Sequence, residues 1–235
     1  MKITPLLHIC CFLYFNYNYG NAIELNEVKS YLADVNSTMW NIVKNYGLSN
    51  LPVPDYQLPY NVSCFGYKLL GSLYLKDGFA FDFSKFLVDE RKIEQRFIPI
   101  KEPNQYTIKG VIEIKKMQIF QDFKFEFQNI TNYTDKAIGS VIIEPDIFTF
   151  LFNITVSFPS KEIVAIVDSL SDIKPGLKFY PNNGLTQRLR KQFFYEAAKK
   201  KEFVLDKLRI EWKPIFDTFL KEAVKQVNFP KFNIE

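Results

Sequence analysis

The spacing of the apolar residues changes twice along this chain of 235 residues, and no other feature constrains the fold as strongly. Over residues 25–46 the apolar residues recur every three or four positions, which indicates an amphipathic helix. Between about residues 67 and 167 apolar and polar residues alternate, as in strands with one buried face. The helical spacing returns over 185–194 and 203–227. Helices at both ends therefore bracket a one-sided sheet, which predicts an α+β fold.

The N-terminal helix is expected to bury one stripe and to end at Gly47, a typical helix C-terminal residue. Lys29 and Asn36 fall on its opposite face, and the proline-rich segment 51–55 continues as an extended chain. The stripe consists of Val28, Tyr31, Leu32, Val35, Met39, Ile42, Val43 and Tyr46.

The predicted strands carry their apolar residues on one face. The clearest is 148–156, where three Phe, an Ile and a Val share a face and Asn153 lies on the other. Short loops such as 76–78 suit hairpins, so an antiparallel meander is expected. The other inward sets are Leu69, Gly71, Leu73 and Leu75; Phe79, Phe81 and Phe83; Ile108, Gly110, Ile112 and Ile114; and Phe123, Phe125 and Phe127.

The C-terminal helical region has a second apolar stripe, and Pro214 within it is expected to kink the helix or to begin a new one. A helix of 22 residues and a strand of nine residues both span about 30 Å. The elements match in length, which predicts a strongly curved antiparallel sheet rolled around long N- and C-terminal helices. The stripe includes Val204, Leu208, Trp212, Ile215, Phe219, Leu220, Val224 and Val227.

Residues 1–22 have the pattern of a secretory signal peptide, with Lys2, a short apolar run and small residues at the end. The run is shorter than the roughly 20 residues that span a bilayer. We therefore expect cleavage after Ala22, a secreted extracellular protein, and one domain over residues 23–235. The mature chain keeps one cysteine, Cys64, which is either a buried thiol or the site of an intermolecular bridge.

Five N-x-[ST] sequons support the secretory route and predict N-linked glycosylation. They begin at Asn36, Asn61, Asn129, Asn132 and Asn153.

Histidine use excludes many function classes, because the only histidine, His8, lies inside the predicted signal. Histidine-based zinc and iron sites and Ser-His or Cys-His nucleophile systems are therefore unavailable in the mature chain. No metal, cofactor or enzyme activity is expected. The net charge of +4, which falls to +3 without Lys2, does not indicate nucleic-acid binding. The basic residues of 188–191 and 199–201 form either a solvated helical face or a contact for anionic lipid.

The chain resembles the group 7 mite allergens and their insect relatives, within the tubular lipid-binding superfamily that includes bactericidal/permeability-increasing, juvenile-hormone-binding and takeout proteins. The similarity lies in the signal, the first helix with GLSNLPVPD over 47–55, LYLKDG over 73–78, the meander and the long C-terminal helix. It covers nearly the whole mature chain. Insect hormone carriers usually have an N-terminal cysteine pair that this mature chain lacks, which favours the allergen-like branch.

The resemblance implies a super-roll whose sheet wraps a long helix and leaves an elongated apolar cavity for a lipid or similar amphiphile. The mature chain keeps 22 Phe, 10 Tyr and 2 Trp, and aromatic residues are good at lining such sites. Ordinary core packing is the alternative for each candidate wall residue. The candidates are Trp40, Val43, Leu73, Phe81, Phe83, Ile112, Phe125, Phe150, Phe152, Trp212, Phe216 and Phe219.

The leading hypothesis is a secreted glycoprotein that binds a small hydrophobic or amphiphilic ligand, such as a lipid, fatty acid or terpenoid, for transport or sensing. The alternative is an innate-immune or host-interaction protein that binds bacterial lipid or a protein partner through its surface, with transient membrane contact. An enzyme acting on lipids ranks last, because no histidine remains to act as the usual base.

Overall fold

The structure is a computed structural model that describes residues 23–47, 50–64, 67–81, 86–98, 104–128, 134–145, 147–170, 175–199 and 201–231. Within these segments the side chains of 62–64, 67, 69, 134, 145, 147, 175, 192, 194–199 and 201–206 are not described. The predicted signal, Phe83, Asn129 and Asn132 lie outside the described residues, and so do the side chains of Cys64 and of the basic run 199–201.

The described chain combines helices with antiparallel strands, which confirms the α+β class. Its helices are α2 (Leu25–Asn45), α3 (Gly184–Lys199) and α4 (Lys201–Gln226), with a short 3₁₀ helix η1 (Glu90–Lys92). Its strands are β1 (Asn50–Val53), β2 (Tyr56–Cys64), β3 (Tyr67–Phe81), β4 (Phe86–Val88), β5 (Glu94–Ile98), β6 (Asn104–Lys115), β7 (Gln118–Gln128), β8 (Thr134–Pro145), β9 (Ile147–Phe158), β10 (Glu162–Leu170) and β11 (Pro175–Tyr180).

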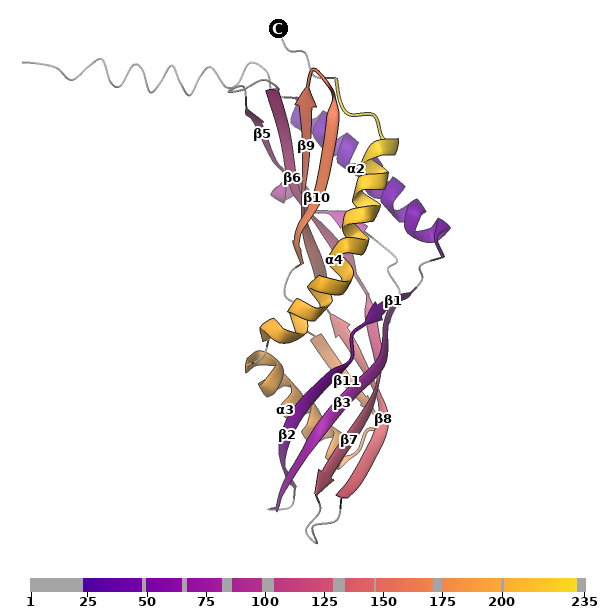
Figure 1. The fold of residues 1–235 in the computed structure, drawn as a ribbon, viewed down its shortest axis with the longest axis vertical. Coiled ribbons are helices and arrows are strands. Elements are labelled where there is room, and N and C mark those ends of the chain that lie inside the picture. Colours follow the sequence, from indigo (N-terminus) through magenta and orange to yellow (C-terminus); the bar gives the residue numbers. More distant parts are fainter. Residues whose placement is uncertain are drawn as a thin grey trace, which may run out of the picture.

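The strands form two sheets, whereas the sequence analysis expected one rolled sheet. One sheet has six strands in the order β1-β3-β7-β8-β11, with β2 also paired to β3. The other has five, in the order β10-β9-β6-β4, with β5 also paired to β6. Figure 1 shows an elongated molecule with the six-stranded sheet and α3 in its lower half and the five-stranded sheet, α2 and α4 in its upper half.

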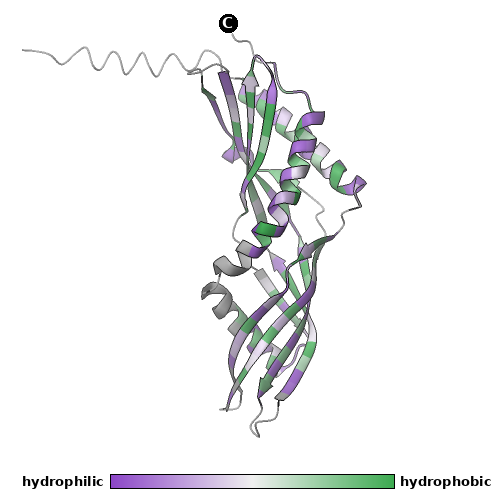
Figure 2. Ribbon diagram, viewed as in Figure 1, coloured by the Kyte–Doolittle hydropathy of each residue, from purple (hydrophilic) through white to green (hydrophobic). Residues whose placement is uncertain are grey.

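The predicted alternation of β9 is confirmed, because Phe148, Phe150, Phe152, Ile154 and Val156 are all buried. Figure 2 shows the same alternation of hydrophobic and hydrophilic residues along the strands. The predicted inner set of β6 is buried too, and its glycine has a packing role. A Cβ atom on Gly110 would lie 2.5 Å from Cζ of Phe152, the residue directly opposite on β9. The missing side chain therefore makes room for the Phe152 ring.

Both predicted helix stripes are largely confirmed. All members of the α2 stripe are buried except Tyr46, which lies beyond the helix end and is 62% exposed. Helix α4 runs through Pro214 without interruption. The hydroxyl of Thr218 donates a hydrogen bond of 2.9 Å to the carbonyl of Pro214. The buried face of α4 consists of Leu208, Trp212, Phe216, Phe219, Leu220, Ala223 and Val224.

Lys29 and Asn36, which were expected on the face of α2 opposite the buried stripe, are partly exposed, and β4 and η1 lie beside that part of the helix. The side-chain nitrogen of Asn36 donates a 2.9 Å hydrogen bond to the carbonyl of Phe86, and its Oδ1 is buried. Lys29 forms an ion pair of 3.0 Å with Glu90. Helix α2 is therefore held on two sides.

The hairpin expected at residues 76–78 does not exist, because β3 continues through them. The pairing of β3 with β7 shifts between Lys76 and Phe79, which is a β-bulge, and Asp77 there has a φ of 52°. A bulge adds one residue and so reverses which face later residues occupy. Ala80 is consequently buried and Phe79 is 37% exposed, so the expected inward face of Phe79 and Phe81 is wrong.

Candidate functional site

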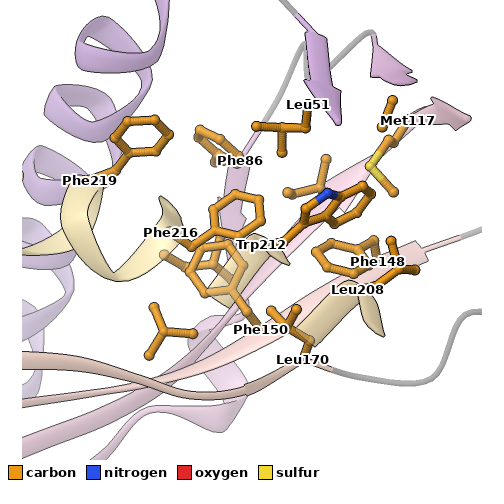
Figure 3. Close-up of a cluster of buried hydrophobic side chains, with 14 of the residues drawn as sticks. Leu51, Phe86, Met117, Phe148, Phe150, Leu170, Leu208, Trp212, Phe216 and Phe219 are labelled. Carbon is orange, nitrogen blue, oxygen red and sulfur yellow. The ribbon is translucent and has the colours of Figure 1, made fainter. Parts of the chain in front are cut away.

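The middle of α4 packs onto the five-stranded sheet through aromatic rings (Figure 3). The ring centroids of Phe148 and Trp212 lie 5.5 Å apart, and those of Phe150 and Phe216 lie 4.9 Å apart and stacked. Trp212 also donates its indole N–H to the carbonyl of Pro52 in β1. These rings are buried and fill the space between helix and sheet.

The predicted cavity residues fall in three places. Leu73 and Phe125 lie opposite each other on β3 and β7, buried on the inner face of the six-stranded sheet. Phe81 lies on the outer face of that sheet, and Phe83 is outside the described residues. The remainder belong to the core between the helices and the five-stranded sheet: Trp40, Val43, Ile112, Phe150, Phe152, Trp212, Phe216 and Phe219. Their role as cavity walls stays a prediction.

A pocket of about 740 Å³ lies beyond this core, where the end of α4 meets the β9–β10 hairpin, near the C label in Figure 1. None of the predicted cavity residues lines it. Its lining residues are Val156, Phe158, Lys161, Ile163, Val224, Lys225, Val227, Asn228, Phe229, Pro230 and Lys231.

The floor of this pocket is apolar because three elements turn their inner faces toward it. Strand β9 contributes Val156 and Phe158 in continuation of its buried set, and β10 contributes Ile163, which pairs directly with Val156. Helix α4 contributes Val224, one turn beyond the buried Leu220. Valine and isoleucine are shorter than the rings nearer the middle of α4, so the space here stays open.

The segment after α4 forms one wall and is anchored by Phe229. The Phe229 ring meets Tyr31 of α2 at 5.1 Å and Tyr106 of β6 at 6.0 Å, both edge to face. Edge-to-face pairs are favourable contacts between aromatic rings. The wall is therefore tied to two elements that lie outside the pocket.

Both tyrosines that hold Phe229 are buried. Burial raises the pKa of Tyr106 to about 12, and it also raises the pKa of Tyr31. The Tyr106 hydroxyl donates to Oε1 of Gln95 and accepts from the backbone N–H of Ile23. The Tyr31 hydroxyl is buried without a hydrogen-bond partner in the described structure. Both side chains are uncharged at neutral pH.

Three lysines surround the pocket, each from a different segment: Lys161 from the hairpin turn, Lys225 from the last turn of α4, and Lys231 from the following segment. All three are exposed, and none forms an ion pair within the described structure. By contrast, Lys221, one turn earlier on α4, pairs with Asp217. Among the described residues no aspartate or glutamate lines the pocket, and the three lysines give the described part of its rim a positive charge.

A smaller pocket of about 280 Å³ lies between β11 and the start of α3. Asn183 and Thr186 organise the start of α3, because Oδ1 of Asn183 accepts from the Thr186 N–H at 3.0 Å and the Thr186 hydroxyl bonds back to the Pro181 carbonyl. Lys178 in this pocket pairs with Glu144 at 2.8 Å. These polar groups already have hydrogen-bond or ion-pair partners within the protein. The larger pocket is therefore the better candidate for a ligand site.

The outer face of the six-stranded sheet carries an aromatic patch, here defined as Phe79, Phe81 and Phe120. The rings of Phe79 and Phe120 stack at 5.3 Å, and those of Phe79 and Phe81 lie 5.8 Å apart. The bulge places the first two rings outside, which the sequence analysis missed. The signal was available in Asp77-Gly78, a pair that rarely occupies the middle of a regular strand.

The sequons with described asparagines differ in accessibility. Asn61 is exposed on β2, and Asn153 is half-buried on the outer face of β9, where its Oδ1 accepts a 3.4 Å hydrogen bond from Thr155. The Asn36 nitrogen, to which a glycan would attach, is instead bonded to the Phe86 carbonyl. A glycan at Asn36 does not fit this arrangement.

Sequence reasoning missed the large pocket because its walls come from residues 156–163 and 224–231. One signal was present: apolar residues and isolated lysines share the segment 224–231, which contains no acidic residue. That signal alone does not identify a pocket. The opposite wall, supplied by the β9–β10 hairpin, appears only in the tertiary structure.

Among the described residues, no helix is long and apolar enough to cross a lipid bilayer. Within the same residues, no three or more His, Cys, Asp or Glu side chains gather as metal ligands would.

Comparison with known proteins gives little guidance. No family model and no curated protein matches the chain. Among solved structures, the chain is similar to one titled "Crystal structure of lipopolysaccharide binding protein", with a TM-score of 0.38 and 10% sequence identity over 84% of this chain. The match covers 36% of that structure's chain, so this chain spans little more than a third of its length.

Proposed function

We propose that the protein binds a small hydrophobic or amphiphilic ligand, such as a lipid, fatty acid or terpenoid, in the pocket at the end of α4, for transport or sensing. The observation that carries this proposal is the apolar floor of a pocket of about 740 Å³. Pockets for small ligands commonly measure about 300–1,000 Å³ and are lined mainly by apolar side chains. The proposed role is binding without catalysis.

The packing of the rest of the upper half supports this location. The space beneath the middle of α4 is filled by buried rings, whereas beneath its end Val224 and Val227 leave room next to Ile163. A ligand that buries apolar carbon in this room gains the free energy of removing that surface from water.

Filling the pocket tests the proposal. Ile163→Trp places a large ring in the pocket, and Val164→Trp is its matched control, because the next residue on β10 points to the other face and is 44% exposed. The neutral fluorescent probe N-phenyl-1-naphthylamine should bind the wild type and the Val164→Trp variant but not the Ile163→Trp variant. Unchanged probe affinity in Ile163→Trp would contradict the proposed site.

Native mass spectrometry of the protein from the culture medium, followed by organic extraction, tests for a natural ligand. A stoichiometric lipid or terpenoid is the expected result. A ligand-free mass, with no uptake when lipids are supplied, would count against a carrier.

We further propose that the protein is secreted and that its mature chain begins at Ile23. The support is local: the Ile23 side chain is 4% exposed, and its backbone nitrogen is hydrogen-bonded to Tyr106. N-terminal sequencing of the secreted protein should give Ile23 first. Glycopeptide mapping should find glycan at Asn61 and Asn153 and an unmodified Asn36; a glycan on Asn36 would contradict its observed packing.

The aromatic patch supports a second candidate function, binding of bacterial lipid or a protein partner through the surface. Soluble proteins rarely leave several aromatic rings together at the surface without a role. The double variant Phe79→Ser/Phe120→Ser separates the two functions. Loss of binding to bacterial-lipid vesicles in this variant, with retained binding in Ile163→Trp, would favour the surface function.

A further inference from the structure

We infer that the ligand of the pocket at the end of α4 carries an anionic head group, which lies among Lys161, Lys225 and Lys231. This inference rests on the proposed function, and it adds the chemical class of the ligand. The shared chemistry is a single carboxylate or phosphate joined to an apolar tail. The tail lies on the apolar floor and the head remains near solvent at the rim.

The first support is the one-sided charge of the rim. Three lysines from three segments line one opening, and no acidic residue in the described part of the chain lines it. They form no ion pair within the described structure, so their ammonium groups keep their capacity for an external anion. Their convergence is a tertiary feature, because Lys161 is 64 residues before Lys225 in the chain.

The second support is that the two carboxylates of α4 described near the pocket are already engaged. Asp217 is bonded to Lys221 and to the backbone N–H of Val167. Glu222 accepts a 3.4 Å hydrogen bond from the Tyr46 hydroxyl. Glu162, next to Lys161, is exposed at the hairpin but does not line the pocket. The positive rim is therefore not neutralised by the charged groups described around it.

One feature opposes an anion at this place. The pocket lies at the C-terminal end of α4, where the helix dipole contributes about half a negative charge. Lys225 lies in that last turn and offsets this partial charge, and Lys161 and Lys231 add two full positive charges. The net charge of these groups at the opening is therefore positive, and it favours an anionic head group over a cationic or a neutral one.

The apolar floor determines where the tail lies. Phe158, Ile163, Val224 and Phe229 line the same pocket as the lysines, so head and tail of one molecule meet both surfaces at once. A free anion without a tail would meet only exposed lysines in water, where each charge pair is weak. The site therefore selects an anionic amphiphile and not an inorganic anion.

Competition between ligands of equal tail length tests this inference. Dodecanoate, dodecyl phosphate, dodecanol and dodecyltrimethylammonium would each be used to displace N-phenyl-1-naphthylamine from the wild type. Both anions should bind about tenfold more tightly than dodecanol, as expected for two or three exposed charge pairs, and the cation should bind most weakly. The ratio of dodecanoate to dodecyl phosphate affinity distinguishes a fatty-acid from a phosphate head group, and higher salt should reduce only the anion affinities.

Two charge-matched variants locate the effect. Lys225→Glu/Lys231→Glu should lose about tenfold in anion affinity while dodecanol affinity stays the same. Lys76→Glu/Lys109→Glu makes the same change in net charge at exposed lysines outside the pocket and should bind like the wild type.

The outcomes separate the two proposals. If dodecanol and the anions bind equally, or if both double variants weaken anion binding equally, the head-group inference is wrong and the binding pocket stands. If neither the probe nor any of these ligands binds the wild type, the proposed function fails, and the inference fails with it. Inhibition by inorganic phosphate at the same concentrations as dodecyl phosphate would also overturn the inference, because it would remove the need for a tail.

Discussion

The same face of α4 covers two regions that are filled to different degrees. Beneath the middle of the helix, Trp212 and Phe216 meet Phe148 and Phe150 of β9, with centroid distances of 4.9 to 6.1 Å. Beneath its end, the helix presents Val224 and the strands present Val156, Ile163 and one ring, Phe158, and a pocket of about 740 Å³ remains.

The comparison shows that side-chain size, and not a change of fold, separates core from pocket here. The same helix and the same strand pair form both regions. Protein interiors pack densely only where side chains are large enough to meet across the space between elements. Where they are not, the space stays open, and at this end of the molecule three lysines lie around it beside the rings of Phe158 and Phe229.

The largest expected effect comes from emptying the filled region. Phe216→Ala should lower the free energy of unfolding by about 4 kcal/mol, because it removes a buried ring and leaves a cavity. Phe216→Leu keeps more of the volume and should cost about 1.5 kcal/mol. Phe79→Ala, which truncates a partly exposed ring, is the control and should cost less than about 1 kcal/mol. Urea denaturation measures all three, and equal losses for Phe216→Ala and Phe79→Ala would contradict the comparison.

A smaller loss is expected from overfilling the same region. Gly110→Ala would place a Cβ atom 2.5 Å from the Phe152 ring, so the ring must shift, at a cost of about 2 kcal/mol. Gly176→Ala is the matched control, since its Cβ would meet no atom closer than 3.4 Å, and a change within about 0.5 kcal/mol is expected. If urea denaturation gives Gly110→Ala the same free energy of unfolding as the wild type, this part of the core is not closely packed.

The wall of the pocket should be easier to disturb than the core. Phe229→Ala removes two edge-to-face ring contacts, with Tyr31 and Tyr106, and should cost about 1.5 kcal/mol. Hydrogen exchange should accelerate over residues 224–231, with exchange in the middle of α4 unchanged. Phe79→Ala, at a partly exposed ring on β3 of the other sheet, is the control. Accelerated exchange along the whole of α4 would mean that the two regions unfold together.

The smallest expected effect is on the pH dependence of the free energy of unfolding, and it comes from an aspartate of the filled region. Burial by itself would raise the pKa of Asp217, but hydrogen bonds from Lys221 and from the Val167 N–H outweigh it and hold the pKa below its ordinary value. A depressed folded-state pKa means that the stabilisation is present above the ordinary carboxyl pKa and is lost as the pH falls through the folded-state value.

The free energy of unfolding measured between pH 7 and pH 3 checks this. The wild type should lose more stability on acidification than Asp217→Asn, whose amide oxygen still accepts from Val167 but cannot titrate. Asp34→Asn, at an exposed position on α2, is the control and should follow the wild type. If the free energy of unfolding falls equally with pH in the wild type and in Asp217→Asn, Asp217 contributes nothing to the pH dependence of stability.

Local periodicity predicted much of the fold. The seven buried residues of α2 and the inward set of β9 were all assigned from spacing alone. Such assignments succeed because a helix or a regular strand turns its side chains by a fixed angle per residue, so one face is known once the period is known. The assignment of Phe79 and Phe81 failed for the same reason, since one bulge residue reverses the face of everything after it.

The candidate site could not be predicted in the same way. The predicted wall residues were mostly large apolar side chains, and seven of those near the five-stranded sheet are buried in the hydrophobic core, with Trp40 packed against it. Large rings are well suited to line a ligand site and equally well suited to fill a core, and spacing does not distinguish these roles. The pocket is lined instead by smaller residues such as Val224 and Ile163, which no size criterion would select.

The sequence by itself determined the terminal helices, the alternating strands between about residues 67 and 167, the inward face of most of these elements and the α+β class, because these depend on residues that are neighbours in the chain. The tertiary structure decided the division into two sheets, the hydrogen bond of Asn36 to the Phe86 carbonyl of β4, the outward turn of Phe79 and the meeting of Lys161 with Lys225 and Lys231. Each of these depends on how segments far apart in the chain pack together, and that arrangement is not encoded in any local period.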